Sequence, residues 1–155
     1  MDRKSAGLLM YRMRDEQAEV FLIHPGGPFW ARKEQGAWSI PKGEFTDEDP
    51  LEAAQREFQE ETGFAASGVF KPLDPIRQTG GKIVHAWAFE GDCDAEAIQS
   101  NTFTMEWPPH SGRQGTFPEA DRAAWFTLAQ AREKILKSQQ PLLDQVEHLV
   151  TTGSQ

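Results

Sequence analysis

Residues 43–64 read GEFTDEDPLEAAQREFQEETGF and contain three glutamates, Glu57, Glu60 and Glu61, at positions i, i+3 and i+4. On a helix this spacing brings the three carboxylates to one face, where each pair repels by about 0.2–0.5 kcal/mol. A divalent cation relieves that repulsion, and carboxylate oxygens are ligands that suit Mg²⁺ and Mn²⁺. The pattern therefore predicts a metal site of the kind that handles phosphate substrates.

The same stretch carries clear start and stop signals for a helix. Asp49 is a good N-cap, Pro50 suits the first helical position, and Glu52 completes a capping-box-like pair with Asp49. Gly63 is a typical C-terminal stop. The apolar stripe between them consists of Leu51, Ala54 and Phe58. We expect the glutamates to occupy the last turns of this helix, opposite the face that packs on the core.

The stretch resembles the Nudix box of the Nudix (MutT-like) hydrolases, which cleave nucleoside diphosphates linked to another moiety. The family pattern is Gly, five residues, Glu, seven residues, then Arg-Glu-hydrophobic-x-Glu-Glu-x-Gly-hydrophobic. Residues 56–64 match every defined position, and Glu48 lies at the required distance before Arg56. Gly43 departs from the pattern, because four residues instead of five separate it from Glu48.

The resemblance implies that Glu57, Glu60 and Glu61 are catalytic and bind Mg²⁺, for which Mn²⁺ can substitute. The backbone carbonyl of the box glycine, here Gly43, would join them as a ligand. Bound metal lowers the pKa of water and polarises the phosphoryl group, and little covalent work falls to the protein.

Arg56 is expected to act behind the metal ligands. The resemblance implies that it pairs with Glu48 and orients the ligands without contacting the substrate. The alternative is an ordinary surface arginine that pairs with Glu52 or Glu60 four residues away.

A further acidic residue is expected from a distant segment. Residues 117–126, FPEADRAAWF, resemble the segment that supplies an additional metal ligand or general base in many Nudix hydrolases, with Trp125 six residues after the acid. Glu119 is the candidate for this role, against the alternative of a solvated side chain. Asp121 and Glu106 are weaker candidates.

Substrate contacts are sought beside the box, where residues 38–43, WSIPKG, resemble the corresponding segment of dinucleoside tetraphosphate hydrolases. The basic candidates for phosphate contact are Lys42, Arg32 and Lys33. The aromatic candidates for stacking on a base are Trp38, Trp30 and Trp107. Each has a plain alternative, as a solubilising loop charge or a core tryptophan. His24 and His85 fall on predicted strands, where a lone histidine is usually structural, and neither is assigned to the site.

The composition limits the kinds of partner that the protein is expected to bind. The chain has 155 residues, which predicts one domain over 1–155, and its net charge of −8 excludes the basic footprint of a protein that binds long nucleic acid. Cys93 is the only cysteine, so no intrachain disulfide forms. The apolar run at 8–11 is too short for a signal peptide, and no stretch is long enough to span a bilayer. We expect a cytoplasmic protein, monomeric or homodimeric.

Hydrophobic periodicity and turn residues predict strands that alternate with helices. The predicted strands are 6–14 and 19–24, joined as a hairpin, then 37–40, 67–72, 76–79, 82–90 and 102–106. The predicted helices besides that of the box are 128–137 and 141–150, followed by a frayed tail at 151–155. Such a pattern indicates a layered α/β domain. The resemblance implies an α/β/α sandwich, with a mixed β-sheet and the box as a catalytic loop–helix–loop beside it.

These features favour an Mg²⁺-dependent pyrophosphohydrolase that acts on a nucleoside polyphosphate, either a dinucleoside polyphosphate or a nucleoside triphosphate. One alternative is a Nudix-fold module that binds a nucleotide and regulates without cleaving it. Another is an acidic globule whose glutamates need no metal. Nucleotide turnover separates the first from the second, and Mg²⁺ binding separates both from the third.

Overall fold

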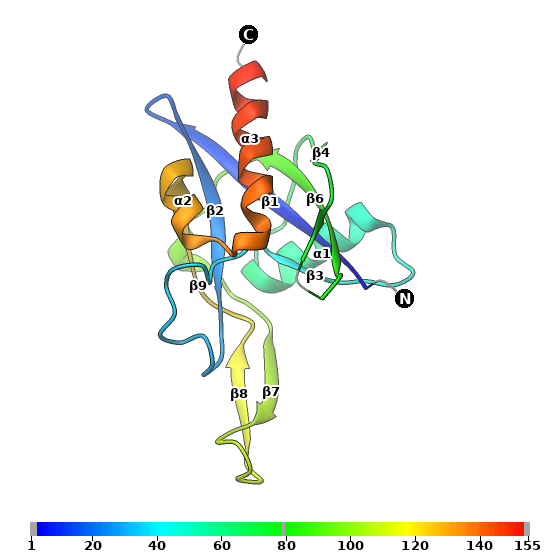
Figure 1. Ribbon diagram of the computed structural model, residues 1–155, viewed down its shortest axis with the longest axis vertical. Helices are drawn as coiled ribbons and strands as arrows, with labels where there is room; N and C mark the ends of the chain where they lie inside the picture. Colours follow the sequence, from blue (N-terminus) through cyan, green and yellow to red (C-terminus); the bar gives the residue numbers. More distant parts are fainter. Residues whose placement is uncertain (1–2, 79, 154–155) are drawn as a thin grey trace.

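The computed structural model describes residues 3–78 and 80–153 (Figure 1). Its main sheet contains β1 (Lys4–Arg14), β2 (Gln17–Pro25), β3 (Lys42–Glu44), β4 (Lys71–Pro72), β5 (Ile76–Arg77), β6 (Ile83–Glu90) and β9 (Ala120–Thr127). A separate hairpin consists of β7 (Thr102–Glu106) and β8 (Gln114–Pro118). The α-helices are α1 (Pro50–Thr62), α2 (Leu128–Lys134) and α3 (Gln140–Gly153), and short 3₁₀ helices cover η1 (Ala95–Ala97) and η2 (Lys137–Gln139).

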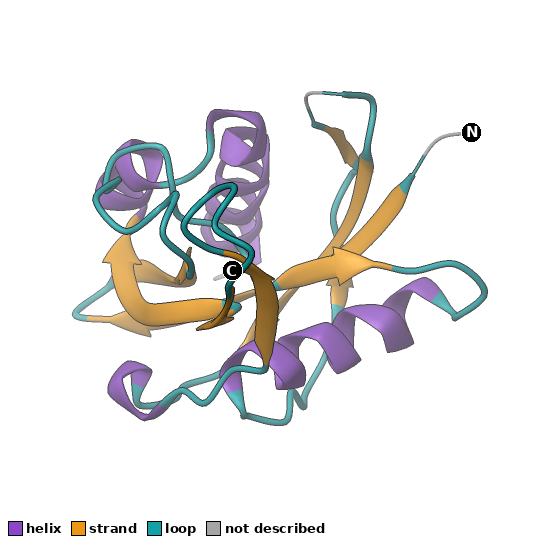
Figure 2. Ribbon diagram, turned by 90° about the horizontal axis from the view of Figure 1, so that it is seen from below, coloured by secondary structure: helices purple, strands orange, loops and turns teal. Residues whose placement is uncertain are grey.

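The main sheet has the order β4-β6-β1-β2-β9, with β3 added to β1 and β5 to β6. Strand β6 runs parallel to β1, and the other pairs are antiparallel, so the sheet is mixed. Helix α1 covers one face, while α2 and α3 cover the other (Figure 2). The predicted α/β/α sandwich with a mixed sheet is confirmed. No helix in the described part of the chain is long and apolar enough to cross a membrane.

Strand β1 is buried on both faces, which explains its unbroken apolar run. Leu8 belongs to the core beneath α1, where it packs in one cluster with Phe58. Leu9 belongs to the core beneath α2 and α3, where it packs in one cluster with Leu142. Successive residues of a strand point to opposite faces, so a central strand feeds both cores. The sheet is thereby fixed between two helical layers.

The box helix begins and ends as predicted. The Asp49 carboxylate accepts a hydrogen bond from the Glu52 backbone N–H at 3.1 Å, and Pro50 lies at the first helical turn. Gly63 closes the helix in the left-handed conformation, at φ 82°, and its N–H donates to the Gln59 carbonyl at 2.8 Å. Both ends of the helix are therefore set by local residues that can be recognised in the sequence.

The β7–β8 hairpin projects from the body of the molecule as an arm (Figure 1). The predicted strand 102–106 is confirmed as β7, whereas β8 and β9 were missed. The acidic, proline-containing segment 117–126 suggests a loop, but backbone pairing with β2 makes most of it a strand. Tertiary pairing thus makes a strand of a segment whose local preference for strand is weak.

Four other expectations need correction. Residues 37–40 form single bridges instead of a strand, and 67–72 is reduced to β4. The predicted helix 128–137 ends at Lys134, because the N–H of Leu136 instead donates to the Trp38 carbonyl at 2.8 Å. Helix α3 continues to Gly153, through much of the segment predicted as a frayed tail. Thr79, the end of the predicted strand 76–79, lies outside the described residues.

Candidate active site

Helix α1 presents its glutamates at two depths. Glu57 and Glu61 are buried, with 8% and 9% of their surface exposed, while Glu60 is half-buried. Burial raises the pKa of Glu57, and the charge of Glu60 acts in the same direction. Burial followed by the charge of Glu57 raises the pKa of Glu61 to about 8. The protein has removed negative groups from water and placed them together, an arrangement that a cation stabilises.

Arg56 connects the carboxylates of the box. Its guanidinium donates to both oxygens of Glu48, at 2.6 and 2.9 Å, which lowers the pKa of that carboxyl. The same side chain donates to Glu57 at 2.9 Å and to Glu60 at 3.1 Å. The pair expected with Glu48 and the alternative pair with Glu60 are thus present together. Arg56 holds these three acidic side chains from one side of the helix.

Gly43 lies directly against the Glu57 carboxylate. A Cβ placed on residue 43 would overlap both oxygens of that carboxylate, so any side chain here would displace the end of Glu57. Residues Lys42 and Gly43 pair with Gly7 and Ala6 in the sheet, which brings this short strand to the helix. The four-residue spacing before Glu48 therefore leaves Gly43 in contact with α1.

Lys42 contacts the site through its backbone. Its N–H donates to Glu61 Oε2 at 3.0 Å, and Lys42 and Glu61 line one cavity. Burial lowers the pKa of Lys42, and the charge of Lys82 acts in the same direction. A partly desolvated ammonium beside carboxylates is well suited to contact phosphate oxygens.

Glu119 reaches the site from the base of the β7–β8 arm, directly after β8. Its N–H donates to the Asn101 carbonyl at 2.8 Å, and the N–H of Asn101 donates to the Glu60 carbonyl at 2.7 Å. The Glu119 carbonyl accepts from Gly26 at 3.0 Å. Burial, with the charge of Glu60 second, raises the pKa of Glu119. These backbone bonds fasten Glu119 to the end of α1 without using its carboxylate.

One cavity of about 200 Å³ unites the candidate groups. Its charged lining consists of Lys42, Glu61 and Glu119. Its remaining lining consists of Ile23, Pro25, Trp30, Ala37, Ser39, Ile40 and Leu136. The cavity thus combines a few charged groups with a mainly apolar lining, the usual composition of a small-molecule site.

A larger, more open hollow of about 630 Å³ lies elsewhere, around Arg12, Cys93 and Trp125. Arg12 is already paired there with Glu19 at 2.8 Å and Asp92 at 2.7 Å. Burial raises the pKa of the Cys93 thiol to about 11, which makes it a poor nucleophile. Size alone does not identify this hollow as the reaction site.

The comparison with protein families agrees with the geometry of the box. The model of the NUDIX domain matches residues 1–146. The chain belongs to the Nudix family. This match covers α1, the strands of the main sheet and the segment of Glu119 alike.

Solved Nudix structures share the fold at low sequence identity. The binary complex of C. elegans Ap4A hydrolase superposes on the protein with a TM-score of 0.67 and 22% sequence identity. The superposition covers 97% of this chain and 98% of that one. The NUDIX domain of Shewanella oneidensis NrtR, complexed with ADP ribose, gives 0.68 at 16% identity, over 97% and 89%. Among curated proteins, the RNA pyrophosphohydrolase of Stenotrophomonas maltophilia is 48% identical over 46 residues, 28% of this chain and 22% of that protein. This match therefore spans less than a quarter of its length.

The donor set fits the divalent metal that Nudix proteins typically use. Among the described residues, no three His, Cys, Asp or Glu side chains converge on a metal position as they stand. Arg56 draws oxygens of Glu57 and Glu60 toward itself instead. The chemistry still fits, because Glu57 and Glu61 are buried hard-oxygen donors and the Gly43 backbone lies beside Glu57.

The candidate substrate residues divide into two groups. Lys42 and Trp30 line the cavity, whereas Arg32 is exposed on the 26–36 loop and is not part of the lining. The expectation for Trp38 needs correction: it is 2% exposed, its ring packs on Phe126 at 5.0 Å, and it cannot stack on a base. Helical and strand patterns do not distinguish a buried tryptophan from a stacking one.

Other substrate candidates lie on the arm or the adjacent loop. Trp107 follows β7 and its ring contacts the exposed Phe29 edge-on at 5.4 Å. Lys33 extends over the Trp30 ring, with Nζ 5.6 Å from its centre. Sequence reasoning missed Leu136, which lines the cavity. It left His24 out of the site as a structural histidine, and His24 is fully buried with both ring nitrogens in hydrogen bonds. No local pattern singles out either residue.

Proposed function

We propose that this Nudix protein is an Mg²⁺-dependent pyrophosphohydrolase that cleaves a phosphoanhydride bond in a nucleoside polyphosphate, either a dinucleoside polyphosphate or a nucleoside triphosphate. The observation that carries the proposal is the shared cavity of Lys42, Glu61 and Glu119, with Glu57 buried on the same helix as Glu61. Carboxylates that suit a metal ion and a lysine that suits phosphate, in a pocket with a mainly apolar lining, match a ligand with charged and uncharged parts.

The metal would be held by Glu57, Glu60, Glu61 and the Gly43 carbonyl, with Glu119 completing the set or acting on water. When bound, Mg²⁺ neutralises phosphate charge and lowers the pKa of water. The raised pKa of Glu119 makes this carboxylate a better proton acceptor than an exposed glutamate.

The remaining groups bind and orient the substrate. The Lys42 ammonium contacts a phosphate oxygen, while Trp30 and Ile40 offer apolar surface to the nucleoside end. Arg56 does not touch the substrate but fixes Glu57 and Glu60 by its hydrogen bonds. One related structure is an Ap4A hydrolase, another is a NUDIX domain complexed with ADP ribose, and the curated relative is an RNA pyrophosphohydrolase. These relatives support a nucleotide ligand in general terms.

A panel of nucleoside triphosphates, dinucleoside polyphosphates and nucleoside diphosphate conjugates tests this proposal. With Mg²⁺, we expect phosphate or nucleotide products from at least one compound, and ¹⁸O-labelled water identifies the attacked phosphorus. Glu57→Gln and Glu60→Gln should each lower turnover by about two orders of magnitude, since metal-held charge contributes several kcal/mol. Normal turnover in both variants would contradict the assigned ligands.

A second candidate is a nucleotide-binding module without turnover. Two observations favour it: the box is one residue shorter between Gly43 and Glu48, and Arg56 engages Glu57 and Glu60. Binding of a nucleotide without product from any member of the panel would support this module and reject the hydrolase. We place the hydrolase first because Arg56 and every carboxylate of the box are present.

A further inference from the structure

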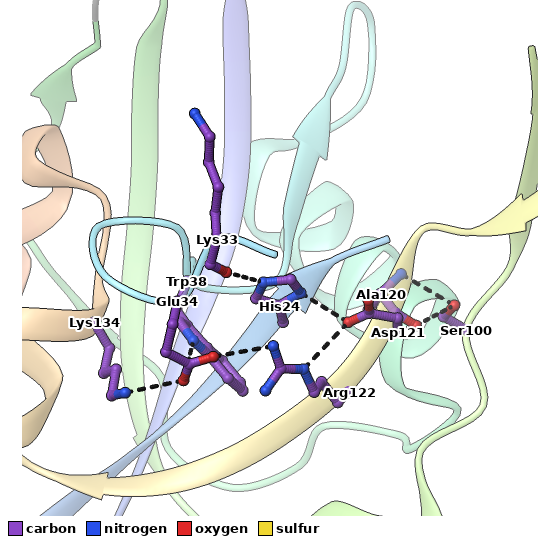
Figure 3. A network of polar contacts seen from close by, with 9 residues as sticks. All are labelled: His24, Lys33, Glu34, Trp38, Ser100, Ala120, Asp121, Arg122 and Lys134. Carbon is purple, nitrogen blue, oxygen red and sulfur yellow. Dashed lines mark hydrogen bonds and ion pairs between the residues drawn. The ribbon is translucent and has the colours of Figure 1, made fainter. Parts of the chain in front are cut away.

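His24, near the end of β2, is fully buried, and both of its ring nitrogens are bonded (Figure 3). Nδ1 lies 2.8 Å from Asp121 Oδ1, and Nε2 lies 2.6 Å from the backbone oxygen of Lys33. A carbonyl oxygen can only accept, so Nε2 carries a hydrogen and donates it to Lys33. One side chain thus joins β9 to the 26–36 loop through the interior of the protein.

The two partners of His24 belong to the segments that line the candidate cavity. Asp121 lies two residues after Glu119, and Lys33 lies three residues after Trp30. Glu119 and Trp30 both line the cavity. His24 therefore links the segment that carries Glu119 to the loop that carries Trp30, and so fixes the distance between these two lining residues.

A β-bulge explains how Asp121 reaches the histidine. His24 pairs with Arg122 and Pro25 pairs with Ala120, so Asp121 is the extra residue on β9. Pro25 has no N–H to offer the ladder, which favours an interruption here. A bulge turns two successive side chains toward one side of a sheet, and bulges are frequent beside active sites.

Glu34 forms a second connection parallel to the first. It accepts hydrogen bonds from Arg122 at 3.0 Å, Lys134 at 2.9 Å and the Trp38 indole at 3.2 Å. The bonds to Lys134 and Arg122 lower the pKa of Glu34. In Figure 3 the pair of residues 33–34 faces the pair 121–122, with His24 between them. This second connection restrains the loop against β9 and α2 but contacts neither Glu119 nor Trp30 directly.

We propose that His24 is a positioning residue that acts on both halves of the reaction. Its bond to Asp121 places Glu119 for the chemical step, and its bond to the Lys33 carbonyl places Trp30 for substrate binding. This role rests on the proposed hydrolase function. A histidine that only stabilises the fold would not separate these two effects.

Two substitutions at His24 separate the two bonds. In His24→Gln the amide nitrogen takes the place of Nε2 and keeps the bond to Lys33, whereas the bond to Asp121 is lost. In His24→Asn the shorter amide takes the place of Nδ1 and keeps the bond to Asp121, whereas the bond to the Lys33 carbonyl is lost and the loop keeps only its restraint through Glu34. We expect His24→Gln to lower kcat about tenfold with KM nearly unchanged, and His24→Asn to raise KM about tenfold with kcat nearly unchanged, since each loses one strong hydrogen bond.

Asp121→Asn provides a second route if a histidine variant folds poorly. The substitution is nearly isosteric and weakens the same bond as His24→Gln, so it should also lower kcat without raising KM. Val146→Ala is the matched control, because Val146 is fully buried in the core beneath α2 and α3. This variant should lose stability while kcat and KM stay as in the wild-type protein. Equal changes of kcat and KM in both His24 variants, or no change in either, would overturn the role of His24.

Binding measurements keep this inference separate from the proposed function. A non-hydrolysable imido analogue of a nucleoside triphosphate, with Mg²⁺, should bind about tenfold more weakly to His24→Asn and equally well to His24→Gln. If the wild-type protein binds the analogue but releases no product from any nucleotide, the proposed hydrolase function is rejected. The affinities of the two variants would still test whether the bond between His24 and the Lys33 carbonyl supports nucleotide binding. Equal affinities of the two variants would overturn that role of the bond.

Discussion

The backbone of Gly43 lies in contact with the carboxylate of Glu57, so that a side chain at residue 43 would have to displace this carboxylate. This contact joins the strand before the box to the helix that carries the candidate metal ligands. It forms although the connecting loop is one residue shorter than the family pattern. Helix α1 and strand β3 are thus in direct contact at Gly43 and Glu57. The four-residue loop that connects Gly43 to Glu48 is long enough to allow this contact.

Gly43→Ala should therefore weaken Mg²⁺ binding and turnover together. The added methyl group must push Glu57 out of its position, and a shift of about 1 Å at a reacting group can lower the rate by about 10²-fold. Mg²⁺ titration of the rate and isothermal titration calorimetry measure both effects. Gly112→Asn is the control, because Gly112 has φ 74°, open space around it and a place at the tip of the arm. An unchanged Mg²⁺ dependence in Gly43→Ala would contradict the role given to this contact.

Arg56→Lys should lower the affinity for Mg²⁺ without removing a ligand. Lysine keeps the charge but cannot donate at once to Glu48, Glu57 and Glu60 as the guanidinium does. Loss of a group that orients metal ligands typically costs about 10–100-fold in metal affinity. The rate measured against Mg²⁺ concentration reports the change, and saturating Mg²⁺ should restore part of the turnover. Arg132→Lys, in an exposed pair with Asp144, serves as the control.

The metal-free protein should lose stability as the pH rises. The folded pKa of Glu61 is raised from 4.5 to about 8, so the unfolded chain releases this proton first. Stability is fully present below pH 4.5 and is lost as pH rises toward 8, by about 1.4 kcal/mol per pH unit for this group. Thermal unfolding in a chelator measures the loss. Glu61→Gln should flatten this pH dependence and stabilise the metal-free protein, while Mg²⁺ should raise its Tm less than that of the wild type.

Gly26→Ala should lower kcat by displacing Glu119. A Cβ at residue 26 would overlap the Pro118 carbonyl, immediately before Glu119. If displacement of that carboxylate is the cause, Gly26→Ala should have little further effect in a Glu119→Gln background, because two changes to one group are not additive. A full additional loss in the double variant would show that Gly26 acts by another route.

The sequence predicts those parts of the structure that local residues control. Asp49, Pro50 and Gly63 define α1 within a few residues of themselves, and the helix has those ends. Trp38 could not be placed, because its burial depends on Phe126, far along the chain. His24 is the clearest case, since its partners come from 9 and 97 residues away. Strand β9 was missed for the same reason, because its pairing with β2 and its bulge at Asp121 are long-range properties.

The β7–β8 arm enters at Asn101 and leaves at Glu119, and the hydrogen bond between these two backbones closes it at its base. Everything between them, including Trp107 at the turn, lies outside that closure (Figure 1). The arm can therefore change in length or sequence while Glu119 keeps its place beside α1. An exchange of the arm between relatives should therefore leave the backbone of Glu119 in its place beside α1.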